Sequence, residues 1–170
     1  MKILGVESSA RAASVAILED DRILAEFSLD TALTHSQTLM ELVAHMFRIS
    51  RISLDEIDLF GVSVGPGSFT GLRIGVSAVK GMAFGRDKPC CGVSTLEALA
   101  YGFVGEEALL CPVMDARCRQ VYQAFFRCSG GKVERLSEDR VVPVARLEEE
   151  LAVKRERVLL NGDGAEACGR

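Results

Sequence analysis

The 170-residue chain has no tryptophan, only two histidines and two tyrosines, and no unbroken apolar run of about twenty residues. A membrane-spanning helix is therefore not predicted. The first residues lack the apolar core and small-residue cleavage site of a signal peptide, so we expect a cytoplasmic protein. The formal net charge of −4 argues against a large nucleic-acid-binding surface on this chain alone.

Motifs for metal and phosphate chemistry are also lacking. The six cysteines form no CxxC pair, and Cys111 and Cys128 lie in apolar runs, which predicts reduced structural thiols. His35 and His45 are too far apart in sequence to form a ligand pair one helical turn apart, and there is no HExxH motif. No glycine-rich phosphate loop with a lysine is present either. No metal site is predicted.

What the chain does contain is a repeated order of elements, three strands followed by a helix and a strand. The first copy is predicted as strands at 2–7, 14–19 and 22–29, a helix at 36–49 and a strand at 59–64. The second is predicted as strands at 108–114, 119–128 and 132–142, a helix at 143–152 and a strand at 158–160. The repeat predicts an α/β protein of two lobes, residues 1–104 and 105–170.

Between the copies lies a stretch that the rest of the chain is organised around. The apolar run 59–64 ends in Gly65-Pro66-Gly67, and Ser68 follows at the position of a helix N-cap. Free amides at a helix start can bind an anion, which makes Gly65, Gly67 and Ser68 candidate nucleotide- or anion-binding residues. A glycine-rich crossover without a ligand explains the same letters equally well.

The helix predicted from residue 69 to about 85 is apolar on nearly all sides, which is typical of a helix buried on more than one face. Glycine in a helix interior costs about 1 kcal/mol relative to alanine. Gly71, Gly75 and Gly81 therefore predict a close backbone approach, made either by this chain's own sheet or by a helix of another subunit.

The first strand of each copy ends in an acid, Glu7 in the first and Asp115 in the second. With Ser8, these residues are candidates for a nucleotide site in a cleft between the copies, and two carboxylates could also serve acid–base chemistry. Alternatively, Glu7 caps the turn at residues 8–13, as short polar side chains often do.

Taken together, six motifs resemble the TsaB (YeaZ) family of bacterial proteins needed for threonylcarbamoyladenosine modification of tRNA. They are the opening Ile3-Leu4-Gly5-Val6-Glu7-Ser8-Ser9, His35-Ser36-Gln37, the Gly65–Gly75 stretch, Gly92-Val93-Ser94-Thr95-Leu96, Asp115-Ala116-Arg117 and Gly162-Asp163-Gly164. The family usually opens with Asp-Thr-Ser where this chain has Glu7-Ser8-Ser9. It also continues past the Gly162 region, so we expect the second lobe to be incomplete.

The resemblance implies an actin-like, ASKHA-type (RNase H-like) pair of lobes that acts as a non-catalytic partner of TsaD. TsaD transfers the threonylcarbamoyl group to adenosine 37 of tRNAs that decode ANN codons. Its two metal-binding histidines correspond to Thr95 and Leu99 here, so no catalytic residue is expected. No cofactor is firmly implied; ATP or ADP with Mg²⁺ at the cleft or at a subunit interface stays open.

Family members pair through the two helices at 36–49 and 69–85, and the implied partners are TsaD, TsaE and a second copy of the chain, with tRNA bound only through the complex. The residues that could form this interface are Leu39, Leu42, Val43, Met46, Leu72, Val76 and Val79. Alternatively, these side chains are simply lobe core. The competing function is an ATP-dependent small-molecule kinase or ATPase that uses Glu7 or Asp115. Direct tRNA binding is a third possible function, which the net negative charge of the chain disfavours.

Overall fold

The computed structural model describes residues 1–168, which divide into two compact units, one of residues 1–93 and one that begins at Ser94. The division lies earlier than the lobe boundary after residue 104 that the repeat predicts. The reason is α3 (Thr95–Tyr101), which contacts β6 (Ala108–Asp115) and β9 (Lys132–Arg135) of the second unit. A helix joins the unit in which it buries its apolar face, and the sequence pattern alone does not say which unit that is.

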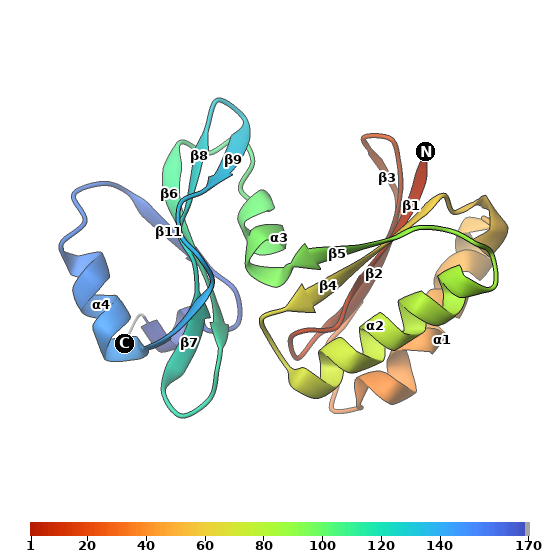
Figure 1. Cartoon of the computed structure of the whole chain (residues 1–170), viewed down its shortest axis with the longest axis horizontal. Coiled ribbons are helices and arrows are strands. Elements are labelled where there is room, and N and C mark those ends of the chain that lie inside the picture. Colours follow the sequence, from red (N-terminus) through yellow and green to blue (C-terminus); the bar gives the residue numbers. More distant parts are fainter. Residues whose placement is uncertain (169–170) are drawn as a thin grey trace. The chain divides into compact units, whose positions relative to one another are not determined.

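The first unit is a five-stranded sheet of order β3-β2-β1-β4-β5. Its strands are β1 (Lys2–Glu7), β2 (Ala13–Glu19), β3 (Arg22–Leu29), β4 (Leu59–Gly65) and β5 (Cys90–Ser94). β1 pairs antiparallel with β2 and parallel with β4. The helices α1 (His35–Ser50) and α2 (Phe69–Phe84) cover the same face of this sheet, as Figure 1 shows. A short 3-10 helix, Leu54–Glu56, precedes β4.

The core of the first unit lies between that face and the two helices. Strand side chains that alternate along the chain point to one face, which is why Leu4 and Val6 of β1 lie in the core. α1 contributes Leu39, Val43 and Met46 to the same core, and α2 contributes Val79 and Met82. The spacing of these helical residues is that of an amphipathic helix, as predicted.

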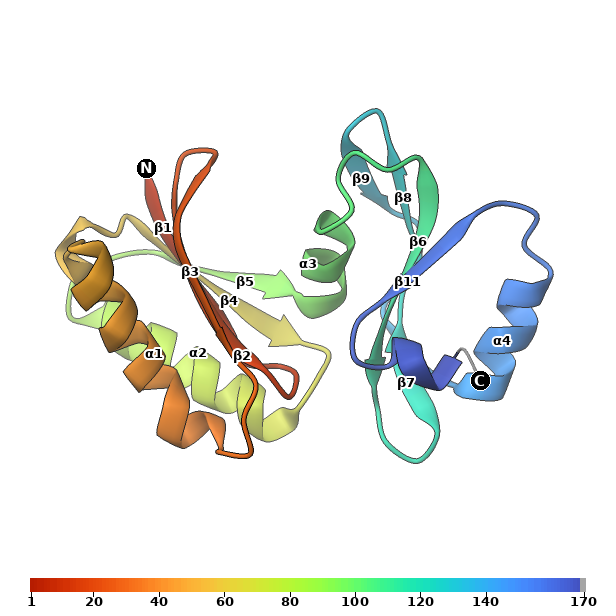
Figure 2. The same cartoon turned by 180° about the vertical axis from the view of Figure 1, so that it is seen from behind.

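The second unit has the sheet order β10-β7-β6-β8-β9, with β11 (Val158–Asn161) paired parallel to β6. The antiparallel strands β7 (Gln120–Gln123) and β8 (Phe126–Ser129) pair with different halves of β6. α3 and α4 (Val144–Ala152) lie on opposite faces of this sheet, which is clear again in the view from behind (Figure 2). The 3-10 helix Ala165–Cys168 packs against α4 and β6.

Two predicted strands of the second unit were wrong in their extent. The segments 119–128 and 132–142 are not continuous strands, because each is interrupted at a bend that divides it between two partners. At this bend Phe125 accepts a hydrogen bond from the backbone N–H of Leu136 (2.8 Å) and donates one to the Ser137 hydroxyl (2.8 Å). The second half of 132–142 becomes β10 (Arg140–Pro143), which pairs with β7. Hydrophobic alternation continues through such a bend, so the letters did not reveal it.

No helix within residues 1–168 is both long and apolar enough to cross a membrane. The six cysteines are free thiols. Cys111 and Cys128 are fully buried, as predicted, and Cys90, Cys91 and Cys118 are exposed. Burial raises the pKa of the Cys111 thiol to about 12, because a thiolate there would lose its hydration.

Candidate functional site

The turn between β1 and β2 is packed against the start of α2. The Ser8 hydroxyl donates to the Gly71 carbonyl (2.9 Å), and the Ser68 backbone N–H donates to the Ser9 carbonyl (2.6 Å). A Cβ on Gly67 would lie 2.5 Å from the Ser9 carbonyl oxygen, and one on Gly71 would lie 2.0 Å from the Ser8 carbonyl oxygen. The two glycines are therefore required by close backbone approach, as the sequence predicted.

The approaching element is this chain's own turn and not another subunit. A Cβ on Gly75 would lie 2.3 Å from the Ser8 hydroxyl oxygen, so Ser8 explains a second helical glycine. His35, at the start of α1, bonds through Nε2 to the Ala10 carbonyl (2.8 Å). The turn thus ties the starts of both helices together. For Gly81 the prediction was wrong, because, apart from its own helix and chain neighbours, none of the described atoms lies within 4 Å of where its Cβ would be.

Glu7, at the carboxyl end of β1, is held by neighbours in its own unit. Its carboxylate accepts hydrogen bonds from the Ser9 backbone N–H (2.5 Å) and from the Ser63 hydroxyl on the parallel strand β4. The bond from Ser9 spans two residues, which is the pattern of an acid that caps a turn. The geometry favours the capping interpretation of Glu7 over a free catalytic carboxylate.

Part of the hydrogen-bonding capacity of this turn is used within the chain. Three backbone amides that could hold an anion already have acceptors in the chain: Ser9 N–H bonds Glu7, Ser68 N–H bonds Ser9, and Gly71 N–H bonds the Ser68 hydroxyl (3.2 Å). Ser68 is the N-cap of α2, as predicted. The carboxylate of Glu7 would also repel a phosphate. The assignment of Glu7, Ser8, Gly65, Gly67 and Ser68 to a nucleotide or anion site stays a prediction.

Asp115 ends β6 of the second unit and repeats the role of Glu7. Its Oδ1 accepts from the Arg117 backbone N–H two residues on (2.8 Å), and its own N–H donates to Asp163 Oδ1 (2.9 Å). The loop that carries Asp163 packs tightly on β6, since a Cβ on Gly162 would lie 2.1 Å from the Val113 carbonyl oxygen. The glycines of this loop therefore have a packing role.

Thr95 and Leu99 lie on one face of α3, a helical turn apart. Thr95 is buried, and its hydroxyl has no hydrogen-bond partner among the described residues. The Leu99 carbonyl accepts from the Asn161 side-chain amide (2.9 Å). Within residues 1–168, no three His, Cys, Asp or Glu side chains gather in a group that could hold a metal ion.

The seven residues that were predicted to form the interface fall into two groups that differ in burial. Leu39, Val43, Met46 and Val79 are at most 3% exposed and belong to the core of the first unit. For these four the prediction is corrected, because a partner cannot contact side chains that the sheet already covers. The other three are only partly buried; they are Leu42, Leu72 and Val76.

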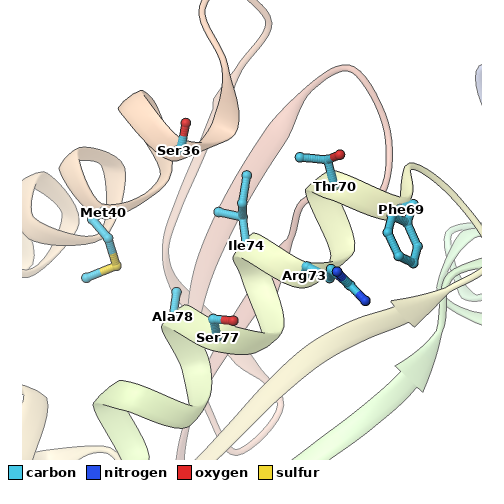
Figure 3. A pocket seen from close by; sticks show the side chains of 8 residues that line it. All are labelled: Ser36, Met40, Phe69, Thr70, Arg73, Ile74, Ser77 and Ala78. Atoms are coloured by element: carbon cyan, nitrogen blue, oxygen red, sulfur yellow. The ribbon is translucent and has the colours of Figure 1, made fainter.

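The outer surface of the two helices contains a groove that the sequence analysis missed. It has a volume of about 620 Å³. Its lining residues, shown in Figure 3, are Ser36, Met40, Phe69, Thr70, Arg73, Ile74, Ser77 and Ala78. Met40 is 48% and Phe69 67% exposed, so two large apolar side chains of the lining remain in contact with solvent. The signal was present in α2, whose apolar residues occupy more of its circumference than one core needs.

Comparisons with known proteins agree with this architecture. Residues 27–165 match the family model of TsaD, described as tRNA N6-adenosine threonylcarbamoyltransferase. The chain is 33% identical to the tRNA threonylcarbamoyladenosine biosynthesis protein TsaB of Bacillus subtilis, over 95% of this chain and 71% of that protein. It spans 55% and 52% of the length of two further TsaB proteins that it matches.

Two solved structures have a similar fold. YeaZ from Pseudomonas aeruginosa superposes with a TM-score of 0.78 at 25% identity, over 95% of this chain and 84% of that one. Component A of the (R)-2-hydroxyglutaryl-CoA dehydratase of Acidaminococcus fermentans has a TM-score of 0.51 at 11% identity, over 91% of this chain and 55% of that one. The second likeness concerns the fold alone, and both agree with the predicted α/β protein of two lobes.

Proposed function

Because the chain belongs to the TsaB family of tRNA threonylcarbamoyladenosine biosynthesis proteins, we propose that it is a non-catalytic subunit that binds and activates TsaD. With TsaE, it would support transfer of the threonylcarbamoyl group to adenosine 37 of tRNAs that decode ANN codons. In this proposal tRNA contacts the chain only within the complex, and a second copy is an alternative occupant of the same surface when the chain is alone.

The observation that carries the proposal is the groove between α1 and α2. Contiguous exposed apolar surface on a protein usually marks a contact with another protein or a ligand. Met40 and Phe69 line the groove, and both are large and exposed. Helices with apolar outer faces pack well against other helices. An assembly of helices is therefore the contact that this surface suits best.

The residues also argue against an active site of the chain's own. Glu7 and Asp115 both cap turns and accept hydrogen bonds from neighbours in their own units. Leu99 cannot bind a metal ion, and threonine, as at position 95, rarely does. The kinase or ATPase alternative would need a carboxylate beside both nucleotide and acceptor, and no observation favours it.

The test is a reconstituted assay of threonylcarbamoyl transfer to tRNA with purified TsaD and TsaE from the same organism. We expect transfer to depend on this chain, and the chain alone to turn over neither ATP nor a small acceptor. Full transfer without the chain would contradict the proposal. ATP turnover by the chain alone, with no effect on transfer, would support the kinase alternative instead.

Two variants test whether the groove is the contact through which the chain stimulates transfer. Met40→Asp places a charge in the groove and should abolish the stimulation of transfer, because burying an unpaired carboxylate is costly. Phe84→Asp is the matched control, since Phe84 is 91% exposed on the same pair of helices but does not line the groove. Equal stimulation by the two variants would mean that the groove is not the contact. Thermal unfolding of both variants checks that they remain folded.

A further inference from the structure

The turn between β1 and β2 joins the starts of the two helices that border the groove. α1 packs on β2 and β3, whereas α2 packs on β4 and β1, so the two helices rest on different strands. His35 of α1 bonds the Ala10 carbonyl of the turn, and Gly71 of α2 accepts from the Ser8 hydroxyl. We refer to these four residues as the turn–helix junction. The position of one helix start relative to the other depends on this junction.

His35 makes two contacts in the junction, one with the turn and one with α2. A carbonyl oxygen only accepts hydrogen bonds, so the Nε2 atom that lies 2.8 Å from the Ala10 oxygen carries a proton. On its other side, Cδ2 of the His35 ring lies 3.1 Å from where a Cβ on Gly71 would be. The imidazole ring therefore fills the space between the turn and the backbone of α2, and a smaller side chain at position 35 would lose both contacts.

The junction lies next to one end of the groove. Ser36 follows His35 in α1 and Thr70 precedes Gly71 in α2, and both Ser36 and Thr70 line the groove, as the close-up shows (Figure 3). His35 itself does not line the groove. A shift of the start of α1 would change the distance between the two lining residues, and with it the width of the groove at this end.

We propose that His35 is a positioning residue, because its bond to the Ala10 carbonyl holds the start of α1 at the distance from α2 at which the groove fits TsaD. This inference rests on the proposed function, since it concerns how the surface that contacts TsaD keeps its shape. The core of a protein–protein interface is packed as densely as a protein interior, so it tolerates little change in the spacing of its side chains. The donor at position 35 therefore affects the affinity for TsaD without a contact of its own.

Variants of graded length test this bond. The side-chain amide nitrogen of glutamine is as many bonds from the backbone as Nε2 of histidine, so His35→Gln keeps a donor within reach of the Ala10 carbonyl. The shorter His35→Asn and His35→Ala do not. Each variant is titrated into the transfer assay at fixed TsaD and TsaE from the same organism. His35→Asn and His35→Ala should raise the half-saturating concentration of the chain about 3- to 30-fold and leave the maximal rate unchanged, and His35→Gln should behave as the wild type does.

A general loss of stability is a different cause of weak binding, and it needs a matched control. Ser53→Ala removes the N-cap of the 3-10 helix Leu54–Glu56, which lies outside the junction and the groove. It also removes one hydrogen bond, so its stability should fall by a similar amount, but its half-saturating concentration should be that of the wild type. Thermal unfolding checks that every variant is folded at the assay temperature. If His35→Ala does not fold, the comparison of His35→Asn with His35→Gln decides.

Hydrogen–deuterium exchange gives a second measurement, which needs no TsaD. His35→Asn should speed the exchange of backbone amides in the first turn of α2 as well as in that of α1, because the two helix starts share the junction. Unchanged exchange in α2 would overturn the inference.

The remaining outcomes separate the inference from its premise. Equal half-saturating concentrations for His35→Asn and His35→Gln would overturn the inference, and so would an equal rise for His35→Asn and Ser53→Ala. In both cases, stimulation of transfer by the wild-type chain would leave the proposed function intact. If the wild-type chain does not stimulate transfer, the proposed function fails, and the role of His35 in TsaD binding fails with it.

Discussion

Replacement of Gly71 by alanine tests the close approach between α2 and the β1–β2 turn. The new Cβ would lie 2.0 Å from the Ser8 carbonyl oxygen and 3.1 Å from Cδ2 of His35. A carbon and an oxygen cannot approach so closely, so the turn or the helix must move by about 1 Å. The obstacle is backbone, and it is held by the hydrogen bonds of Ser8 and Ser9 to α2, so it cannot yield as a flexible side chain does.

The expected change in the free energy of unfolding is the sum of two opposing contributions. Overpacking of this kind costs about 1–3 kcal/mol, and a rigid backbone contact places Gly71 at the upper end. Alanine recovers about 1 kcal/mol through its higher helix propensity. The net loss in the free energy of unfolding is therefore about 2 kcal/mol. For a chain of this length that lowers Tm by about 4–8 °C.

Gly81 provides the matched control on the same helix. Because it faces open space, Gly81→Ala should gain most of the helix-propensity term, about 1 kcal/mol, and raise Tm by about 2–4 °C. Thermal and urea unfolding, followed by circular dichroism, measure both variants. A Gly71→Ala variant as stable as wild type would refute the packing argument. A destabilised Gly81→Ala variant would show that helical glycines matter here for another reason.

Three further results are expected. Ser68→Ala should cost about 1 kcal/mol of stability in urea unfolding, because the hydroxyl that caps Gly71 N–H is lost, and an unchanged midpoint would contradict the cap. The hydrogen bond from Arg140 lowers the pKa of Glu150 below its ordinary value of 4.5. The pair therefore contributes stability above about pH 4.5 and loses it as the pH falls through the lowered pKa. Glu150→Gln should flatten this acid dependence of the unfolding free energy, and an unaltered pH profile would refute it. Thiol labelling at pH 8 should modify the exposed cysteines rapidly, but Cys111 only after unfolding, because its pKa is about 12, and labelling of native Cys111 at the rate of an exposed thiol would count against its burial. The exposed cysteines are Cys90, Cys91 and Cys118.

Local signals predicted most of the elements. α1 was expected at 36–49 and spans His35–Ser50, and α2 was expected from residue 69 and begins there, because apolar period and N-cap chemistry act over a few residues. Of the helical glycines that were predicted to need a close approach, Gly71 and Gly75 do and Gly81 does not. The divided strands of the second unit were missed, since their division depends on distant pairing partners: β7 and β8 pair with different halves of β6, whereas β9 pairs with β8 and β10 with β7.

The candidate site was predictable only in part. Glu7 and Asp115 were placed correctly at strand ends, but which atoms they bind depends on Ser63 and Asp163, far away in the sequence. Likewise, Leu39 and Met40 are adjacent in α1, yet one is fully buried and the other is 48% exposed. The hydrophobicity of a residue indicates that its side chain favours burial, but it does not indicate which surface will bury it.

The sequence by itself determined the order of the elements in the first unit, the N-cap of α2, the close approach at Gly67 and Gly71, and the family to which the chain belongs. Those features depend on contacts within a few residues or on the letters themselves. Only the tertiary structure decided which apolar residues of α1 and α2 form the core, and that Arg73 lies beside Phe69 in an open groove. The reason is physical: burial and the pairing of charges are set by segments that meet only when the chain is folded.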